Sequence, residues 1–333
     1  MNAMTFKEKI GMEKFLFTSE LGPPKSASAA AIRKKTAYFK NGVDCVNVTD
    51  NQTAIVRLSS TASAVICRDE GVEPIVQMTC RDRNRLALQS DLLGLGALGI
   101  PNVLCLTGDY QRFGNHPEAR GVFDLDSIQL IYTADRLRKG AFLSGDTMKN
   151  KPDLCIGGAA NPFADPLEFR VLRLAKKIAA GADFIQTQPV FDIDRFSEWM
   201  ESVRKAGLHR KTAILAGVMP VKSARALLYM KSEVPGMRIS GELIERMEKA
   251  GDPKEEGIRL AVETILELKK IEGIRGIHLM PLLWESITPR IAEQAGLIQN
   301  RPESIENGER NIPDKGMAGN PTDNKEKNRR KST

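Results

Sequence analysis

The sequence has few of the residues from which metal centres and disulfide frameworks are built. Among 333 residues there are only five cysteines and three histidines, and no two cysteines are spaced C-x-x-C. Zinc-type and iron–sulfur ligand spacings are therefore absent, and no metal site is predicted. An odd number of scattered cysteines also argues against a disulfide framework, so we expect a reducing, cytoplasmic location.

Long apolar runs are missing as well. No stretch approaches the ~18 consecutive apolar residues of a membrane-spanning helix. The segment from Met1 to Lys14 carries charges throughout and lacks the apolar core of a secretory signal. The net charge is +7, and the last thirteen residues, 321–333, hold five basic and two acidic side chains. The rest of the chain has no basic stripe with interleaved aromatic residues, which argues against nucleic-acid binding.

What the chain does contain is a repeat of short apolar runs, each followed by an amphipathic helical pattern. We predict eight strands, over residues 15–20, 44–50, 74–80, 102–108, 154–160, 184–189, 212–218 and 276–282. Because most of these runs are apolar at successive positions, helices must cover both faces of the strands. Eight such units with right-handed crossovers predict a (β/α)8 TIM barrel of the α/β class, and a doubly wound open sheet is the alternative.

Domain organisation follows from where this pattern stops. We expect residues 1–298 to form a single TIM-barrel catalytic domain. Residues 299–333 are rich in Asn, Glu, Lys, Pro and Gly and have few apolar anchors, so we expect a polar, disordered tail there.

One glycine motif has the wrong context for its usual function. Residues 94–99 spell G-x-G-x-x-G, but a dinucleotide-binding turn follows a strand and opens a helix. Here a helical pattern over 82–93 precedes the glycines and a predicted strand follows them. We therefore interpret the motif as the end of a helix.

Polar residues stand at the ends of six predicted strands. In a TIM barrel, catalytic side chains project from the carboxyl ends of the strands, so these residues would share one rim. A single polar residue at such a place is often a helix cap, but six together predict an active site. They are Glu20, Thr49 with Asp50, Gln77 with Thr79, Thr107 to Asp109, Asn161 and Gln188.

The chemistry of five positions can be specified further. A carboxyl group that ends an apolar strand, as Glu20 does, suits a general acid. Gly108 would let a ligand approach the backbone closely, and Gln188 offers both a donor and an acceptor to a heterocycle with an amide edge. Lys176 and Lys177 either reach a phosphate or form a solvated helix face.

These residues, in this order, make the chain resemble the methylenetetrahydrofolate reductase family from about Phe15 to Leu297. The resemblance implies an FAD-containing TIM barrel that reduces 5,10-methylenetetrahydrofolate to 5-methyltetrahydrofolate in one-carbon metabolism and methionine biosynthesis. The segments that carry it are 19–24, 46–49, 78–80, 106–109, 160–162, 181–188 and 217–221.

The same resemblance assigns roles to individual residues. Glu20 would be the general acid that helps to open the one-carbon bridge, and Asp109 would stabilise the positive charge that develops on the folate. Gln188, with Asp109, would bind the folate. The FAD site would be lined by Thr49, Gln77, Thr107, Gly108, Asp109, Asn161 and Lys177.

The chain departs from the usual family pattern on the nicotinamide side. Ala226 and Met230 stand where most members have Gln and Phe, and Trp284 stands where they have Arg. In this respect the chain resembles the branch from anaerobic and acetogenic bacteria, in which a small partner protein works with the reductase. The expected reductant is NAD(P)H or a partner electron-transfer protein with an iron–sulfur cluster, and an oligomer or hetero-complex is expected.

Two other functions remain open from the sequence. One is a folate-binding methyltransferase subunit, which would pass a methyl group between methyltetrahydrofolate and a corrinoid protein. The other is a non-catalytic binding subunit, which the charged tail suggests. A flavin in the purified protein would separate the reductase from both.

Overall fold

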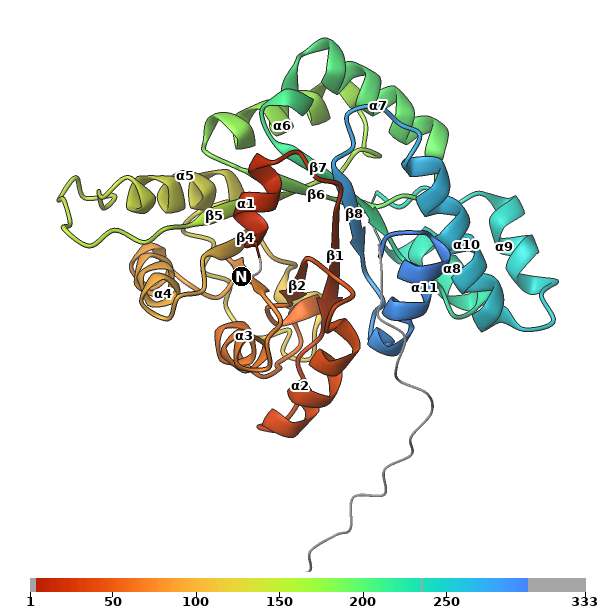
Figure 1. Cartoon of the computed structure of the whole chain (residues 1–333), viewed down its shortest axis with the longest axis horizontal. Coiled ribbons are helices and arrows are strands. Elements are labelled where there is room, and N and C mark those ends of the chain that lie inside the picture. Colours follow the sequence, from red (N-terminus) through yellow and green to blue (C-terminus); the bar gives the residue numbers. More distant parts are fainter. Residues whose placement is uncertain (1–3, 235, 299–333) are drawn as a thin grey trace, which may run out of the picture. The chain divides into compact units, whose positions relative to one another are not determined.

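Eight parallel strands form a closed barrel in chain order (Figure 1). The structure is a computed structural model that describes residues 4–234 and 236–298. The ring closes where β1 pairs with β8, with Leu16 beside Gly276. The strands are β1 Leu16–Leu21, β2 Cys45–Val48, β3 Pro74–Thr79, β4 Asn102–Leu106, β5 Cys155–Ala160, β6 Phe184–Pro189, β7 Ala213–Val218 and β8 Gly276–Leu279. The predicted TIM barrel and all eight predicted strands are confirmed, and the open-sheet alternative is wrong.

Helices surround this ring, and polar side chains mark where many of them begin. Ser28, Asn84, Asp126 and Asp192 each accept hydrogen bonds from free N–H groups of the first turn. After β1 to β6 in turn come α2 Ala29–Thr36, α3 Ser60–Asp69, α4 Arg85–Ala97, α5 Ser127–Arg138, α6 Leu167–Ala179 and α7 Ile193–Lys205. Between β7 and β8 lie α8 Ala224–Glu233, α9 Gly241–Glu248 and α10 Pro253–Leu268, and α11 Thr288–Gln294 follows β8.

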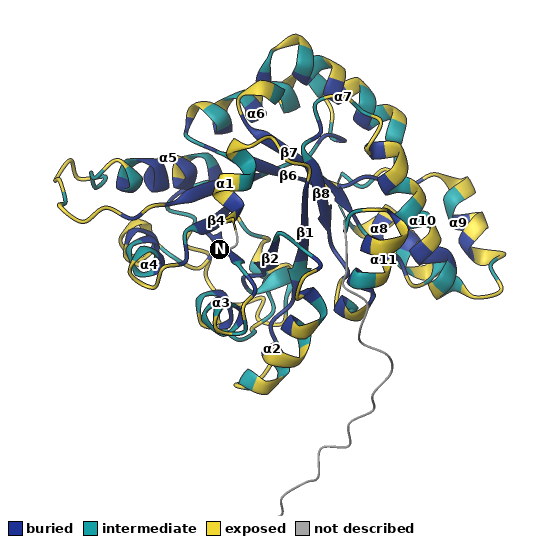
Figure 2. Cartoon of the chain, in the orientation of Figure 1, coloured by how far each residue is buried: buried dark blue, intermediate teal, exposed yellow. Residues whose placement is uncertain are grey.

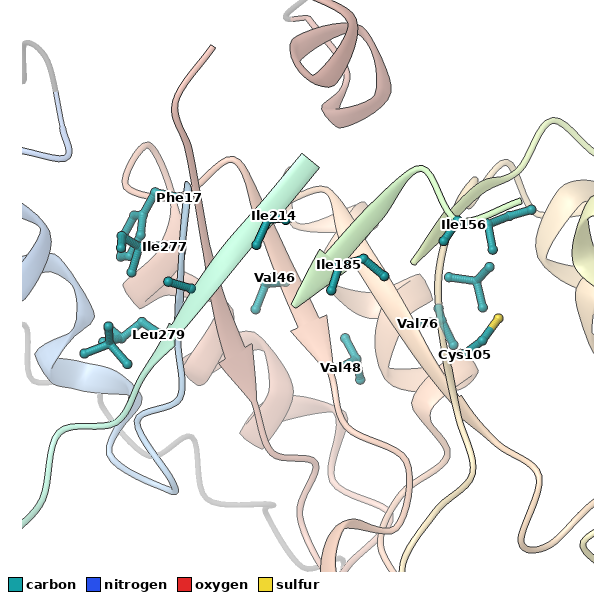
Figure 3. Close-up of a cluster of buried hydrophobic side chains, with 14 of the residues drawn as sticks. Phe17, Val46, Val48, Val76, Cys105, Ile156, Ile185, Ile214, Ile277 and Leu279 are labelled. Carbon is teal, nitrogen blue, oxygen red and sulfur yellow. The ribbon is translucent and has the colours of Figure 1, made fainter. Parts of the chain in front are cut away.

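The main core lies between the strands and the helices. Alternate strand residues point outward into it, and the helices bury their inner faces against them (Figure 2). Figure 3 shows these side chains, which come from all eight strands: Phe17, Val46, Val48, Val76, Cys105, Ile156, Ile185, Ile214, Ile277 and Leu279. All are at most 3% exposed.

The intervening strand residues point into the barrel, and near its amino-terminal end they form a second apolar cluster. This cluster contains Leu16, Cys45, Ile75, Leu104, Cys155, Phe184, Ala213 and Leu215. The helix α1 Phe6–Gly11 closes it from below, because Phe6 is fully buried and meets the ring of Phe184 edge to face at 5.2 Å. The amino-terminal end of the barrel is therefore plugged.

Polar contacts hold α1 in place. The carboxylate of Glu73 accepts hydrogen bonds from the Phe6 backbone N–H (2.9 Å) and from Asn102 Nδ2 (2.8 Å). Lys9 pairs with Asp44 at 2.7 Å, and Asp44 in turn accepts from the Phe17 backbone. Burial is the largest influence on Glu73 and raises its pKa.

The G-x-G-x-x-G run has the context expected for a helix end. Gly94 and Gly96 lie inside α4, Leu98 caps it, and Gly99 has φ +67° before the chain enters β4. A left-handed glycine after the last helical turn is a common way to stop a helix. The interpretation as a helix terminus is confirmed.

Several findings bear on the expected class of protein. No helix within residues 4–234 and 236–298 is long and apolar enough to cross a membrane. In the same ranges no group of three or more His, Cys, Asp or Glu side chains could hold a metal ion. All five cysteines are buried and free. The predicted tail, residues 299–333, lies outside the described residues.

Candidate active site

Apart from Lys177 on α6, the predicted site residues lie at or just beyond the carboxyl ends of β1 to β6. These ends meet at one rim because all strands of the barrel are parallel. The inward-facing positions change character along the barrel. They are apolar near α1, and on β1, β2, β3, β6 and β8 they are polar further along, where Thr18, Asn47, Gln77, Gln186 and His278 lie. A polar interior at the carboxyl end of a barrel is where ligands and catalytic groups are accommodated.

Glu20 and Gln77 form one group on this rim. Gln77 Nε2 donates a hydrogen bond to Glu20 Oε1 at 3.0 Å. The bond joins β1 to β3, which are separated by β2, so it must cross the barrel interior. The side chain of Glu20 is 12% exposed, and among the described residues no hydrogen bond reaches its second oxygen. Glu20 therefore presents one free carboxyl oxygen at the barrel mouth.

A buried polar network lies directly below Glu20. Asn47 and Gln186 exchange hydrogen bonds of 2.6 and 3.1 Å across the barrel, and Gln186 Nε2 also donates to Thr18 Oγ1 at 3.2 Å. Thr18 Oγ1 lies 2.9 Å from His278 Nδ1, and His278 Nε2 lies 3.5 Å from Glu20 Oε1. Each of these four residues is at most 2% exposed. The network connects the strand that carries Glu20 to three other strands.

A second group surrounds a cavity of about 220 Å³ beside the ends of β4, β5 and β6. Three of its lining residues are cations on α6, namely Arg170, Arg173 and Lys177. The polar residues around it are Thr107, Ser127, Asn161 and Gln188. A cavity with three cations among its lining residues suits an anionic group such as a phosphate.

Lys177 is the most strongly perturbed of these cations. It is 7% exposed, and its Nζ donates to the Ala159 carbonyl at 2.5 Å. Burial, followed by repulsion from Arg173, lowers the pKa of Lys177 to about 8. Its neighbour Lys176 is exposed. Lys176 therefore lies on a solvated helix face, whereas Lys177 lines the cavity, where contact with a phosphate stays a prediction.

The loop after β4 contributes backbone as well as side chains. Thr107 Oγ1 accepts from the Ser127 N–H at the start of α5 (3.2 Å). Gly108 has φ +91°, and a Cβ there would lie 3.0 Å from the Arg81 side chain and 3.1 Å from Thr79. The position therefore favours glycine. Asp109 is exposed, and its carbonyl accepts from Arg81 at 3.4 Å.

The end of β2 has a structural role. Asp50 accepts hydrogen bonds from the backbone and the hydroxyl of Thr79 at 3.0 and 2.9 Å, and it pairs with Arg83 at 2.7 Å. These contacts tie β2 to the loop after β3. The neighbouring Thr49 is 1% exposed, and its hydroxyl has no hydrogen-bond partner among the described residues.

The remaining predicted residues differ in exposure. Gln188 is exposed at the mouth, next to an irregularity in the β6–β7 register between Gln186 and Pro189. Asn161 Oδ1 accepts from the Phe163 N–H at 2.9 Å. Met230, on the nicotinamide side of the family pattern, is 7% exposed and packs in a small cluster with α9, while Lys222 lies over the ring of Trp284 at 5.3 Å.

The structure thus brings the predicted residues together as two groups, the Glu20–Gln77 pair and the cavity that Thr107, Asn161, Lys177 and Gln188 line. Thr49 and Asp109 do not line that cavity. Sequence reasoning missed the network of Thr18, Asn47, Gln186 and His278 and the cations Arg170 and Arg173. The available signal was alternation, since Thr18 lies two positions before Glu20 and Gln186 two before Gln188, on the same face of each strand.

Comparison with known proteins shows where this arrangement belongs. The model of the methylenetetrahydrofolate reductase family matches residues 5–296. Methylenetetrahydrofolate reductase 1 of Schizosaccharomyces pombe is 27% identical over 242 residues, which cover 70% of this chain and 37% of that protein. Methylenetetrahydrofolate reductase (NADH) 1 of Arabidopsis thaliana is 28% identical over 302 residues, which cover 85% of this chain and 48% of that protein. The chain thus spans half or less of the length of these relatives.

A solved structure supports the fold. An uncharacterized protein from Clostridium thermocellum, described as binding two copies of 5-methyl-5,6,7,8-tetrahydrofolic acid, superposes with a TM-score of 0.63 at 16% identity. The match covers 88% of this chain and 99% of that one. At this identity the likeness concerns the barrel architecture alone.

Proposed function

Because the chain belongs to the methylenetetrahydrofolate reductase family, we propose that it reduces 5,10-methylenetetrahydrofolate to 5-methyltetrahydrofolate with FAD as cofactor. Glu20 serves as the general acid. Asp109 and Gln188 contact the folate. The family match supports this activity, and the roles of individual residues are those that the family resemblance implies.

The observation that carries the proposal is the asymmetric environment of the Glu20 carboxyl group. One oxygen is held by Gln77 at 3.0 Å, while the other has no hydrogen bond within the described part of the chain. A general acid needs a fixed side chain and a free oxygen that can reach the substrate. Glu20 meets both requirements, and it can transfer its proton as the one-carbon bridge of the folate opens.

The cationic cavity fits the charged part of a flavin dinucleotide. A diphosphate needs cations, and the cavity offers Lys177, Arg170 and Arg173 on α6. Gly108 has φ +91°, and a Cβ there would meet Arg81 and Thr79, so glycine is favoured at this point of the loop that borders the cavity. Thr107 and Asn161 complete the lining, and we place Thr49 and Gln77 on the barrel side of the cofactor. Bound flavin would supply the hydride for the reduction.

The exposed polar residues at the mouth are proposed to handle the substrate. The carboxylate of Asp109 stabilises positive charge on the folate, since it is an anion on an exposed loop at the rim. Gln188 is exposed and lines the cavity, so its amide is free to donate to and accept from a pterin edge.

The reductant is proposed to be a partner electron-transfer protein with an iron–sulfur cluster. Met230 is buried in the cluster that α8 shares with α9, so this position offers no exposed aromatic ring for a nicotinamide to stack on. Trp284 stands where the family pattern has an Arg. The check is anaerobic spectroscopy of the purified flavoprotein. Slow bleaching by NADH and NADPH is expected, and rapid, complete bleaching would overturn this choice of donor.

Substitution of Glu20 tests the proposed activity. In Glu20→Gln the flavin should still bind, while the rate at which 5,10-methylenetetrahydrofolate reoxidises dithionite-reduced flavin should fall about 10³-fold, a typical loss for a general acid. Glu118→Gln, on a side chain that is 75% exposed, is the matched control and should leave this rate unchanged. An unaltered rate in Glu20→Gln would remove Glu20 from the mechanism.

The visible spectrum of the purified protein distinguishes the reductase from the methyltransferase alternative. A reductase should be yellow as purified, with the absorption bands of bound flavin. A colourless protein that passes methyl groups from methyltetrahydrofolate to a corrinoid protein would replace the reductase proposal.

A further inference from the structure

One of the buried polar side chains beneath the site belongs to His278. The register of the barrel places it beside Thr18 on β1, and its side chain is 3% exposed. Its two ring nitrogens have different neighbours. Nδ1 lies 2.9 Å from Thr18 Oγ1, and Nε2 lies 3.5 Å from Glu20 Oε1. The imidazole therefore stands between the buried network and the proposed acid.

The direction of the hydrogen bonds follows from the donors. Gln186 Nε2 donates to Thr18 Oγ1, which leaves the Thr18 hydroxyl proton for His278 Nδ1. A neutral imidazole whose Nδ1 accepts carries its proton on Nε2. That N–H then faces Glu20. If the amides of Asn47 and Gln186 were reversed, His278 would carry its proton on Nδ1. The lone pair of His278 Nε2 would then face a carboxylate oxygen of Glu20, which is repulsive.

The two oxygens of Glu20 are thereby made unequal. Gln77 and His278 both face Oε1, and within the described residues no hydrogen bond reaches Oε2. An oxygen that faces two N–H groups is a poor place for a proton, so the acidic proton belongs on Oε2. That is the oxygen left free at the mouth.

We propose that His278 is a positioning residue whose Nε2–H, fixed by Thr18 and Gln186, holds Glu20 so that its acidic proton is carried by the substrate-facing oxygen. This inference rests on the proposed function of Glu20. The long 3.5 Å separation is expected to shorten when the substrate is bound, as contacts of catalytic groups commonly do.

Two substitutions of His278 separate positioning from packing. The amide nitrogen of Gln reaches the place of Nε2, whereas that of Asn reaches the place of Nδ1. His278→Asn should lower the limiting rate of flavin reoxidation by 5,10-methylenetetrahydrofolate about 30-fold, with the apparent folate affinity nearly unchanged. His278→Gln should recover most of that loss. His116→Asn, at a side chain 54% exposed, is the control.

The outcomes divide cleanly. The proposal would be overturned if both His278 variants lost the same fraction of the reoxidation rate and the same amount of stability to urea. The histidine would then contribute by packing alone. So would a rate within about threefold of wild type in His278→Asn, because a contact of this kind should be worth more. An inactive wild-type protein would instead refute the proposed function.

A measurement on the unmodified protein needs no activity. With three histidines in the chain, ¹⁵N spectra at a pH where the imidazoles are neutral can assign each tautomer. His278 should carry its proton on Nε2, and Thr18→Val should mix the two tautomers. A proton on Nδ1 in the wild-type protein would contradict the inference, whatever the reductase assay shows.

Discussion

At the scale of single residues, Lys177 has a charge that costs free energy until a ligand neutralises it. Its folded-state pKa is about 8, well below the ordinary 10.5, because it is buried beside Arg173. A lowered lysine pKa reduces the free energy of unfolding, and this reduction has its full size at pH values below 8. It disappears as the pH rises from 8 to 10.5. An anion bound in the cavity would offset the same cost by pairing with the charge.

We therefore expect opposite effects of Lys177→Met on stability and on cofactor affinity. Without flavin, the variant should be more stable at pH 7 by up to about 3 kcal/mol, since each pKa unit corresponds to about 1.4 kcal/mol. Flavin should bind about tenfold more weakly. Urea unfolding of the apoprotein and fluorescence titration with FAD measure the two effects.

The pH dependence adds a second readout. Flavin affinity of the unmodified protein should fall as the pH rises from 7 to 9.5, because Lys177 loses its proton, and Lys177→Met should abolish most of this dependence. Lys176→Met is the control, since that side chain is exposed on the same helix. If both variants behaved alike, the cavity would not be the phosphate site.

At the scale of elements, α1 closes the barrel with one aromatic side chain. Phe6 is completely buried against Phe184, so Phe6→Ala should lower the free energy of unfolding by about 3 kcal/mol. Met12→Ala, just after α1 at a residue that is 61% exposed, should have little effect. Urea midpoints compare the two. Similar midpoints would show that α1 is not part of the cooperative unit.

A glycine sets how closely α10 approaches the barrel. A Cβ on Gly257 would lie 1.7 Å from the Val221 carbonyl oxygen, so an alanine there must displace the helix or the loop after β7. Gly257→Ala should cost about 2 kcal/mol, in the range known for overpacking. Gly241→Ala, in α9 where nothing lies within 4 Å, should be neutral or slightly stabilising. Thermal unfolding of both variants is the measurement, and a neutral Gly257→Ala would contradict the close packing.

The same elements explain what could be predicted from the sequence. The strands were recognisable because a run such as 213–218 is apolar on both faces, a local pattern that helix-covered strands require. Alternation along the strands could show that Thr18 and Gln186 face inward, but the pairs that form the network around His278 were not recognisable. The network joins Thr18 to His278 across 260 positions and Asn47 to Gln186 across 139, and no local period encodes such pairs. The burial of Lys177 could not be predicted either, because its exposure depends on how α6 packs against β5.

At the scale of the whole molecule, we expect the barrel to be complete without residues 299–333. A chain that ends after Ile298 should unfold at the same urea concentration as the full chain and should reoxidise its flavin at the same rate, since the site residues all lie before that point. A lower midpoint or a slower rate would give the tail a role in the domain.

Closure of the ring has a consequence for how the protein is made. The first and last strands become neighbours only when Leu16 meets Gly276, so a nascent chain keeps two unpaired sheet edges until its final strand has been synthesised. Contacts of such long sequence separation also form slowly. The growing chain therefore faces its greatest risk of aggregation late in translation, and helpers that shield exposed strand edges should matter most at that stage.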